Sequence, residues 1–497
     1  MDFVTIAVLS LVLAFNEAPY RWLRDPAFVI AAVAVATLLP ALCAWVLNRA
    51  ALSKLEHHVE DPGIGQSFFG TWYGRLQSLI SALHAALLGL TDWLRLCNQL
   101  PVIGEWPGLP GMIASLPLIL SIILIWIVTY PSDRALRQIA LEINLHRGRP
   151  VHPVWSLPQF VMYSLRHQVL FIVIPMACIL VVRDLITRND DWLRAFVGHR
   201  QAPDLALGAA AAVIAIIAPV MLRYVWVTQP LPESPLRRRL LDMCAKLKLK
   251  CREILVWRSG GMIVNAAVVG VVPPLRYVMI TDGMLEQMDD TKIEAVFGHE
   301  TGHIKRHHIL YFLLYAFITG CMLTIVGNWT RSVDRRTFEW VVAGLGVLMV
   351  CKWWLLFGWI SRHFERQADL FGVRTLALAG IPCDRECAMH RDGIDAQSIG
   401  TGPRDRVCQT AAHVFSDTLN EVAVLNGIPP EVHTWRHGSI SGRSRHVQML
   451  ASDPAAAERF ENKVERIKLA ILLTAIFMAV WAVVELKLWK IVVKWWA

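Results

Sequence analysis

Residues 291–303, which read TKIEAVFGHETGH, decide what this chain of 497 residues is expected to do. Positions four apart on an α-helix lie on one face, one turn from each other. His299 and His303 can therefore direct their imidazoles at one metal ion. Glu300 follows the first histidine, where its carboxylate could act as a base toward water. The pattern His-Glu-x-x-His predicts a zinc-dependent hydrolytic site on a helix.

Local signals predict that this stretch is helical. Asp289 and Asp290 precede it, and Thr291 and Glu294 have the spacing of a capping box. No proline interrupts the stretch, and Gly302 is its one weak helix former. Taken alone, the pattern also fits two solvated histidines on a polar helix.

The composition is that of a membrane protein. The chain is 55% hydrophobic and only 18% charged, whereas soluble domains average about 25% charged residues. The net charge is 49 − 40 = +9, and the basic residues gather between apolar runs, as membrane orientation requires. We therefore expect the lipid bilayer as a partner and no nucleic acid.

Apolar runs predict the membrane topology. We expect a multi-pass α-helical membrane protein with about eight spans, of which the first is short and could be a signal anchor. The expected spans are 4–15, 28–47, 112–130, 169–182, 205–227, 309–325, 340–360 and 467–484. Leucines and isoleucines recur at helical spacing over 76–94 among polar residues, which predicts an amphipathic helix packed on protein or lying at the interface.

These spans divide the chain. The expected parts are an N-terminal transmembrane region (1–228), two halves of a soluble domain (229–308 and 361–466) separated by a transmembrane hairpin (309–360), and a C-terminal helix and tail (467–497). Lysine and arginine are enriched in 131–167 and 229–308, which predicts that both face the cytoplasm together with the histidine motif. Three lysines after the last span mildly contradict this orientation.

A catalytic zinc needs a third protein ligand and one open position. Glu365 is the candidate, 62 residues after His303, because the intervening hairpin returns the chain to the same side of the membrane. Asp369 lies one helical turn later and could accept a hydrogen bond from the outer N–H of a ligand histidine. On spacing alone, an acidic face paired with Arg362 and Arg366 is an equal alternative.

The two motifs together, HETGH at 299–303 and SRHFERQAD at 361–369, resemble the integral-membrane zinc peptidases that include the CAAX prenyl proteases and the HtpX heat-shock proteases. The resemblance implies a zincin-like α/β metallopeptidase domain and one Zn²⁺ per chain. It implies that His299, His303 and Glu365 bind the metal, that Glu300 is the general base, and that Asp369 supports a ligand histidine.

The resemblance extends to two weaker matches. Asn265-Ala266 lies in a β-prone run, where the family has an edge strand that pairs with the substrate backbone. The match implies that Asn265 binds substrate; the alternative is a buried strand with asparagine at a turn.

The second weaker match is a late histidine with an arginine six residues on. It implies that His437 and Arg443 stabilise the oxyanion and organise the site. The sequence has Gly438 where the family usually has proline, and Arg445 and His446 compete for the assignment.

We therefore expect a membrane-embedded zinc metalloendopeptidase that hydrolyses peptide bonds of membrane-associated or lipidated substrates. Prenylated C-terminal peptides and damaged membrane proteins are both open as substrates. The alternatives are an idle scaffold or sensor that keeps the fold, and a transporter. A bacterial inner membrane is expected before the endoplasmic reticulum membrane.

Two further groups of residues carry weaker expectations. Cys383, Cys387, His390 and Cys408 could bind a second metal, although their spacing is not that of a standard zinc site. His307 and His308 directly follow the motif, and we expect them to be interface residues rather than ligands.

Overall fold

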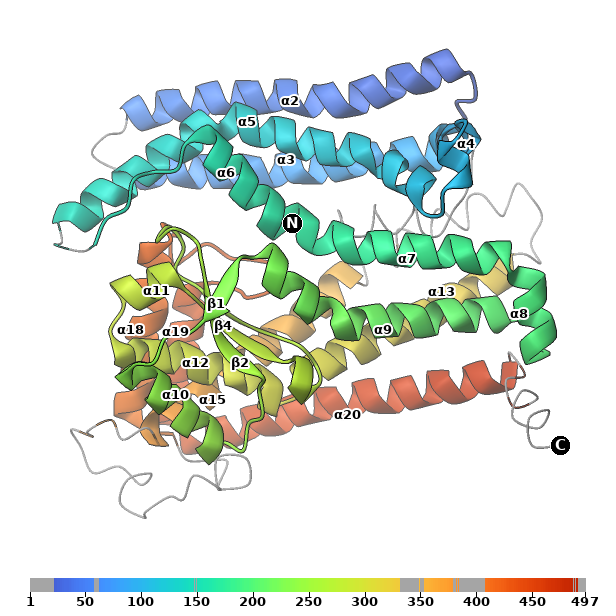
Figure 1. The fold of residues 1–497 in the computed structure, drawn as a ribbon. Helices are drawn as coiled ribbons and strands as arrows, with labels where there is room; N and C mark the ends of the chain where they lie inside the picture. The colour runs from blue at the N-terminus through green and yellow to red at the C-terminus, as the bar shows by residue number, and fades with distance from the viewer. Residues whose placement is uncertain are drawn as a thin grey trace. The chain divides into compact units, whose positions relative to one another are not determined.

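The computed structural model describes residues 22–57, 62–146, 150–330, 353–378 and 407–485, with a few single positions between these ranges. The chain divides into two compact units, Met1–Val227 and Thr228–Ala497. Figure 1 shows long helices in both units and a small sheet in the second.

The first unit is helical throughout its described residues. Helix α3 buries the leucine stripe predicted over 76–94 against α2 and α5, with Leu76, Ile80 and Leu87 among its buried residues. Later in the unit, α7 packs on α9. The elements are α2 (Pro26–His57), α3 (Pro62–Leu90), α4 (Trp93–Gln99), η1 (Ile103–Glu105), α5 (Leu109–His146), α6 (Leu157–Ser164), η2 (Leu165–Leu170), α7 (Phe171–Arg188), α8 (Asp190–Val197) and α9 (Ala202–Val225).

Five helices in the described part of the chain are long and apolar enough to cross a membrane. They are Pro26–His57, Leu109–Ile139, Leu157–Arg188, Ala202–Val225 and Ala455–Glu485. Four of them contain a predicted span, and Ala202–Val225 covers all but the last two residues of 205–227; together with the composition, these helices make the chain an integral membrane protein.

The other three predicted spans have different outcomes. The run 309–325 falls on α13 (His308–Thr330), whose described apolar part, His308–Met322, is shorter than a full span. The run 4–15 and most of 340–360 lie outside the described residues, so the number of spans stays a prediction.

The second unit is built on a four-stranded sheet with the order β1-β2-β4-β3. Strands β2 and β4 are parallel and central. Their residues form nearly continuous buried runs, as expected for strands that are covered on both faces. Strand β3 pairs antiparallel with β4 and forms one edge. The elements are β1 (Thr228–Pro230), α10 (Pro235–Lys246), β2 (Glu253–Trp257), β3 (Ala266–Val269), η3 (Pro273–Leu275), β4 (Tyr277–Thr281) and α11 (Asp282–Gln287).

Helix α12 (Asp290–Lys305) carries the histidine motif and begins earlier than predicted. Asp289 is its N-cap, with a side-chain oxygen accepting from the amide of Lys292 at 3.0 Å. The predicted capping box of Thr291 and Glu294 is wrong, because Asp289 already satisfies the first-turn amide. Glu294 pairs instead with Arg239 of α10 at 2.5 Å.

Helix α12 is clamped between the sheet and the C-terminal helices. Phe297 and Ile293 join the core under the sheet, while Ala295 packs with Phe415 of α18. Helix α13 packs along α20. The remaining elements are η4 (Trp353–Phe357), α15 (Gly358–Leu378), α18 (Gln409–Leu425), α19 (Ile440–Ser452) and α20 (Pro454–Glu485).

Candidate metal centre

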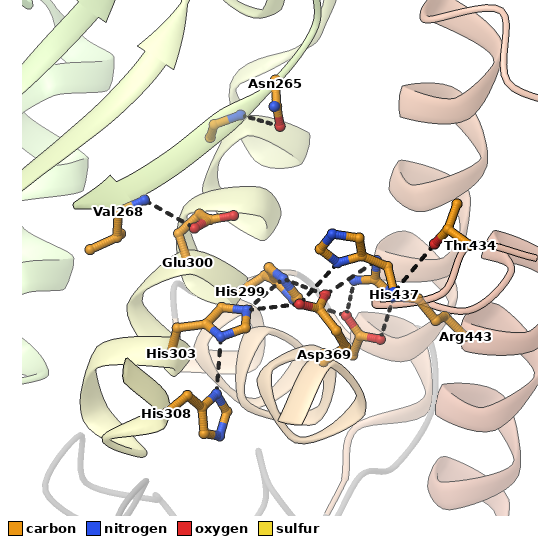
Figure 2. A network of polar contacts seen from close by, with 12 residues as sticks. Asn265, Val268, His299, Glu300, His303, His308, Asp369, Thr434, His437 and Arg443 are labelled. Carbon is orange, nitrogen blue, oxygen red and sulfur yellow. Dashed lines mark hydrogen bonds and ion pairs between the residues drawn. The ribbon is translucent and has the colours of Figure 1, made fainter. Parts of the chain in front are cut away.

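Helices α12 and α15 bring three ligand atoms to one point (Figure 2). Nε2 of His299 lies 3.2 Å from Nε2 of His303, and these atoms lie 3.6 and 3.7 Å from the carboxylate oxygens of Glu365. Ligands around a tetrahedral ion with bonds of about 2.1 Å stand about 3.4 Å apart. The separations and the donor set of two imidazoles and a carboxylate therefore fit a metal ion.

Glycines make this convergence possible, because α12 and α15 approach closely. A Cβ at Gly298 would lie 3.2 Å from Cα of Gly372, and a Cβ at Gly302 would lie 3.2 Å from Cα of Ala368. Contacts this short leave no room for a side chain between the helices. Gly302, the weak helix former of the motif, is thus required by packing.

Asp369 orients the first ligand. Its Oδ1 lies 2.9 Å from Nδ1 of His299, so the ring nitrogen facing Asp369 is the protonated one and Nε2 is free for a metal. Arg443 of α19 donates to both oxygens of Asp369, at 2.9 and 2.5 Å. Asp369 is fully buried, and this bidentate pair compensates its charge.

The electrostatics of the site favour the neutral form of His303 and the ionised form of Glu365, as metal binding requires, whereas they favour the protonated form of His299 while no metal is bound. Desolvation lowers the pKa of His303 to about 4, which keeps this ligand neutral. Burial lowers the pKa of His299, but the hydrogen bond and charge of Asp369 outweigh it and raise the pKa above its usual value. Although burial opposes ionisation, Arg443 lowers the pKa of Asp369 to about 2. In Glu365, the hydrogen bond from His437 and nearby positive charge outweigh burial and hold the pKa well below its usual value.

Glu300 has the properties of a base. Its Oε2 accepts a hydrogen bond from the amide of Val268 at 3.2 Å, which ties the side chain to strand β3 (Figure 2). Desolvation raises the pKa of its carboxyl to about 7. A carboxylate with a pKa near neutrality can both take and return a proton at physiological pH.

His437 reaches the site from a tight turn. Its Nδ1 lies 3.0 Å from Oε1 of Glu365, and its side chain is 49% exposed. The turn is closed by two backbone hydrogen bonds between Thr434 and Gly438, each 3.0 Å long. Gly438 has a φ of 76°, which proline cannot adopt. The glycine that stands in the place of the usual proline is therefore required by this turn.

Arg443 lies behind the ligands. Besides Asp369, its guanidinium stands 3.6 Å from Oε2 of Glu365, and the residue is buried. Of the two competitors, Arg445 is exposed and His446 packs edge-on against Phe460. Among the described residues, Arg443 is the one of the three that forms an ion pair with a predicted ligand.

Asn265 precedes edge strand β3. Its backbone bonds Thr281 of β4, so the amides of Ala266 and Val268 point to the open side of the sheet. The Asn265 side chain accepts from the amide of Ala266 at 2.9 Å, and the amide of Val268 is the one that bonds Glu300. The edge strand therefore adjoins the base.

Sequence reasoning missed His308. We expected it at an interface, but it is fully buried and its Nδ1 lies 3.0 Å from Nδ1 of His303. The intervening helix break, with His307 at a φ of 57°, turns His308 back toward the motif. The only sequence signal was that His308 is a histidine directly after the motif, which does not predict this turn.

The cysteines of the proposed second metal site are only partly described. Cys383 and Cys408 lie with their sulfurs 3.6 Å apart. Cys387 and His390 fall outside the described residues.

Comparison with known proteins identifies the second unit. Residues 230–467 match the sequence model of Peptidase family M48. A protease HtpX homolog of Desulforapulum autotrophicum is 28% identical over 195 residues, covering 36% of this chain and 61% of that protein. A protease HtpX homolog of Sulfurovum sp. is 36% identical over 141 residues, covering 28% of this chain and 49% of that protein. The chain therefore spans between half and three fifths of these relatives.

A crystal structure of Ste24p from S. mikatae aligns with 90% of this chain and 99% of its own, at a TM-score of 0.47 and 13% sequence identity. Residues 230–467 are thus similar to Peptidase family M48, in agreement with the motifs at 299–303 and 361–369, and the three potential metal ligands lie within this matched segment.

Proposed function

We propose that this protein is a membrane-embedded zinc endopeptidase. One observation carries the proposal: the ligand atoms of His299, His303 and Glu365 lie at tetrahedral separations, with the carboxylate of Glu300 next along the helix. Two imidazoles and a carboxylate are a donor set that suits zinc. The protease HtpX homologs named above support the same activity.

The residues divide the chemistry between them. A zinc ion held by the three ligands supplies Lewis acidity, which acidifies water and polarises a carbonyl. Glu300 takes a proton from the attacking water and gives it to the leaving amine, as its pKa of about 7 allows. The exposed His437 stabilises the oxyanion, and Arg443 fixes Asp369 and with it the ring of His299.

Strand β3 is the proposed platform for the substrate backbone. An extended peptide can pair with an open sheet edge through main-chain hydrogen bonds, which gives little dependence on side chains. The amides of Ala266 and Val268 point to this edge. A bound peptide would displace the carboxamide of Asn265 from Ala266, so Asn265 is free to bond the peptide instead.

Membrane-associated or lipidated chains are the proposed substrates. Helix α12 is followed within three residues by α13, whose apolar stretch begins at His308, and this supports a metal site near the membrane surface. Both prenylated C-terminal peptides and damaged membrane proteins can reach such a position. Comparing cleavage of one peptide with and without its prenyl group separates the two classes.

The test of the activity is the substitution Glu300→Gln. We expect kcat/KM toward a casein-type or prenylated peptide to fall at least about 100-fold, because the base is removed. The zinc content of the purified protein should stay equal to wild type, because Glu300 is not a ligand. Glu458→Gln makes the same carboxylate-to-amide change at an exposed position of α20. It is the matched control and should keep full activity.

The outcomes separate the peptidase from an idle scaffold. If wild type and Glu300→Gln are equally inactive while both bind zinc, the protein is a scaffold or sensor that retains the fold. If purified wild type holds no zinc, or Glu365→Ala holds as much as wild type, the ligand assignment is wrong.

A further inference from the structure

A chain of buried polar side chains runs from the second histidine ligand to helix α20. Nδ1 of His303 lies 3.0 Å from Nδ1 of His308, whose Nε2 lies 3.0 Å from Oε1 of Gln367. Gln367 then donates through Nε2 to Glu461, at 2.7 Å. His308 and Gln367 are both fully buried, and Glu461 is 1% exposed. Figure 2 shows the first of these bonds, below the ligand cluster.

The far end of the chain fixes the direction of its hydrogen bonds. Glu461 pairs with Arg374 of α15 at 2.7 Å and with Arg306 at 3.1 Å. A carboxylate held by two guanidinium groups is ionised and can only accept hydrogen bonds. The amide NH₂ of Gln367 must therefore face Glu461, and its carbonyl oxygen must face His308.

The hydrogen bond to Gln367 also determines which ring nitrogen of His308 carries a proton. A carbonyl oxygen only accepts, so Nε2 of His308 carries the proton that it donates to Gln367. A second proton would place a charge on a fully buried ring, which costs several kcal/mol unless it is paired. Nδ1 of His308 is therefore an acceptor. The ring is also held in plane, because it stacks on Phe364 with centroids 4.4 Å apart and planes 9° apart.

We propose that His308, held by Gln367 and Glu461, is the positioning residue that sets the tautomer of His303. Since Nδ1 of His308 accepts, Nδ1 of His303 must donate, and the lone pair of His303 is placed on Nε2, toward the metal. This inference rests on the proposed zinc site. It makes the metal site depend on α20 as well, because Glu461 of α20 fixes the direction of this series of hydrogen bonds.

The two histidine ligands are thus oriented in different ways. His299 contacts a carboxylate directly, that of Asp369. For His303 the carboxylate is that of Glu461, and two side chains, His308 and Gln367, lie between them. The neutral imidazole of His308 and the amide of Gln367 each accept a hydrogen bond on one side and donate one on the other. Replacing a residue that fixes the tautomer of a ligand histidine typically weakens metal binding 10- to 100-fold. We expect an effect of this size at His308, although it touches no metal.

The experiment measures zinc affinity by competition with a chromophoric chelator, using the full-length protein in detergent. His308→Leu should weaken zinc binding about 10- to 100-fold. His308→Gln should bind within about threefold of wild type, because an amide can accept from His303 and donate to Gln367 with the same polarity. His307→Asn is the matched control at the exposed neighbouring position and should bind as wild type.

Folding is checked on the metal-free proteins by thermal unfolding and gel filtration. If His308→Leu does not fold, Gln367→Met tests the relay without touching His303 and should weaken zinc binding about tenfold. Wild-type affinity in a folded His308→Leu or Gln367→Met protein would overturn the proposal. Equal loss in His308→Gln and His308→Leu would overturn it as well, since shape and not polarity would then matter. Wild type without zinc would instead overturn the metal site itself.

Discussion

At the scale of single residues, His437 and Arg443 both contact Glu365 but differ in their surroundings. His437 is half-exposed on a turn. Arg443 is buried and bound to both oxygens of Asp369. A buried guanidinium in a bidentate pair is a structural as well as an electrostatic group. The two residues should therefore fail in different ways when they are replaced.

We predict that Arg443→Ala destabilises the protein by about 3–5 kcal/mol, because it leaves the carboxylate of Asp369 buried without its partner. His437→Ala should destabilise the protein less than Arg443→Ala does, because His437 is half-exposed, but should lower kcat about 100-fold or more through loss of oxyanion stabilisation. Thermal unfolding in detergent and steady-state kinetics on the same samples measure both effects.

Arg443→Ala and His437→Ala serve as controls for each other, because the first should mainly lower stability and the second should mainly lower kcat. Arg443→Lys keeps the charge but loses the fork geometry, and should fall between wild type and Arg443→Ala in stability. If Arg443→Ala unfolds at the wild-type temperature, the pair with Asp369 does not hold the site together.

Spacing predicted which residues share a helix face, because His299 and His303 are one turn apart, and so are Glu365 and Asp369. Spacing did not distinguish Glu365 and Asp369 from an acidic surface face, and their expected roles came from the resemblance of the two motifs to the membrane zinc peptidases. His308 could not be found in this way, because its approach to His303 depends on a break in the helix between them. The acceptor that caps α12, Asp289, was also misjudged, because several acidic and hydroxyl side chains compete at that terminus.

At the scale of elements, the site depends on how closely α12 and α15 approach. Two ligands lie on one helix and the third on the other, so the spacing of the helices sets the separation of the ligands. A Cβ at Gly372 would lie 3.1 Å from the backbone nitrogen of His299 and 2.7 Å from Cε2 of Phe415. Backbone cannot yield as a flexible side chain can, so an added methyl group would push the helices apart.

We predict that Gly372→Ala destabilises the protein by about 1–3 kcal/mol and also weakens zinc binding. Gly320→Ala, on α13, is the matched control, because a Cβ there meets nothing within 4 Å. Alanine is the better helix former, so the control should be neutral or slightly stabilising. Thermal unfolding and the chelator competition measure both variants. Unchanged zinc affinity in Gly372→Ala would mean that helix spacing does not control the ligands.

Packing of this kind was outside the reach of sequence reasoning. Gly302 was noted only as a weak point in a helix, whereas its lack of a side chain lets Ala368 and Phe371 of α15 approach. The hydrophobic pattern predicted that 76–94 would be an amphipathic helix packed on protein or lying at the interface, and the resemblance around Asn265-Ala266 implied the edge strand β3. The sequence could not predict that the amide of Val268 would bond Glu300, because the two residues are 32 positions apart in the chain.

At the scale of the whole molecule, orientation in the membrane decides which substrates can be cleaved. Basic residues concentrate in 131–167 and 229–308, which predicts that both segments face the cytoplasm. The motif at 299–303 lies in the second of these segments. The lysines after the last predicted span are the one group that argues against this orientation, so the orientation needs a direct measurement.

We predict that the protein, expressed in a bacterial cytoplasmic membrane, cleaves an impermeant peptide only from the cytoplasmic face. Sealed inverted vesicles should cleave the peptide when it is added outside, because the metal site then faces the medium. Sealed right-side-out vesicles should cleave it only after detergent is added. Total activity after solubilisation normalises the two preparations, and vesicles with Glu300→Gln give the background. Cleavage by intact right-side-out vesicles at the solubilised rate would place the metal site on the opposite face and would make the charge of the C-terminal lysines, rather than of the loops, the determinant of orientation.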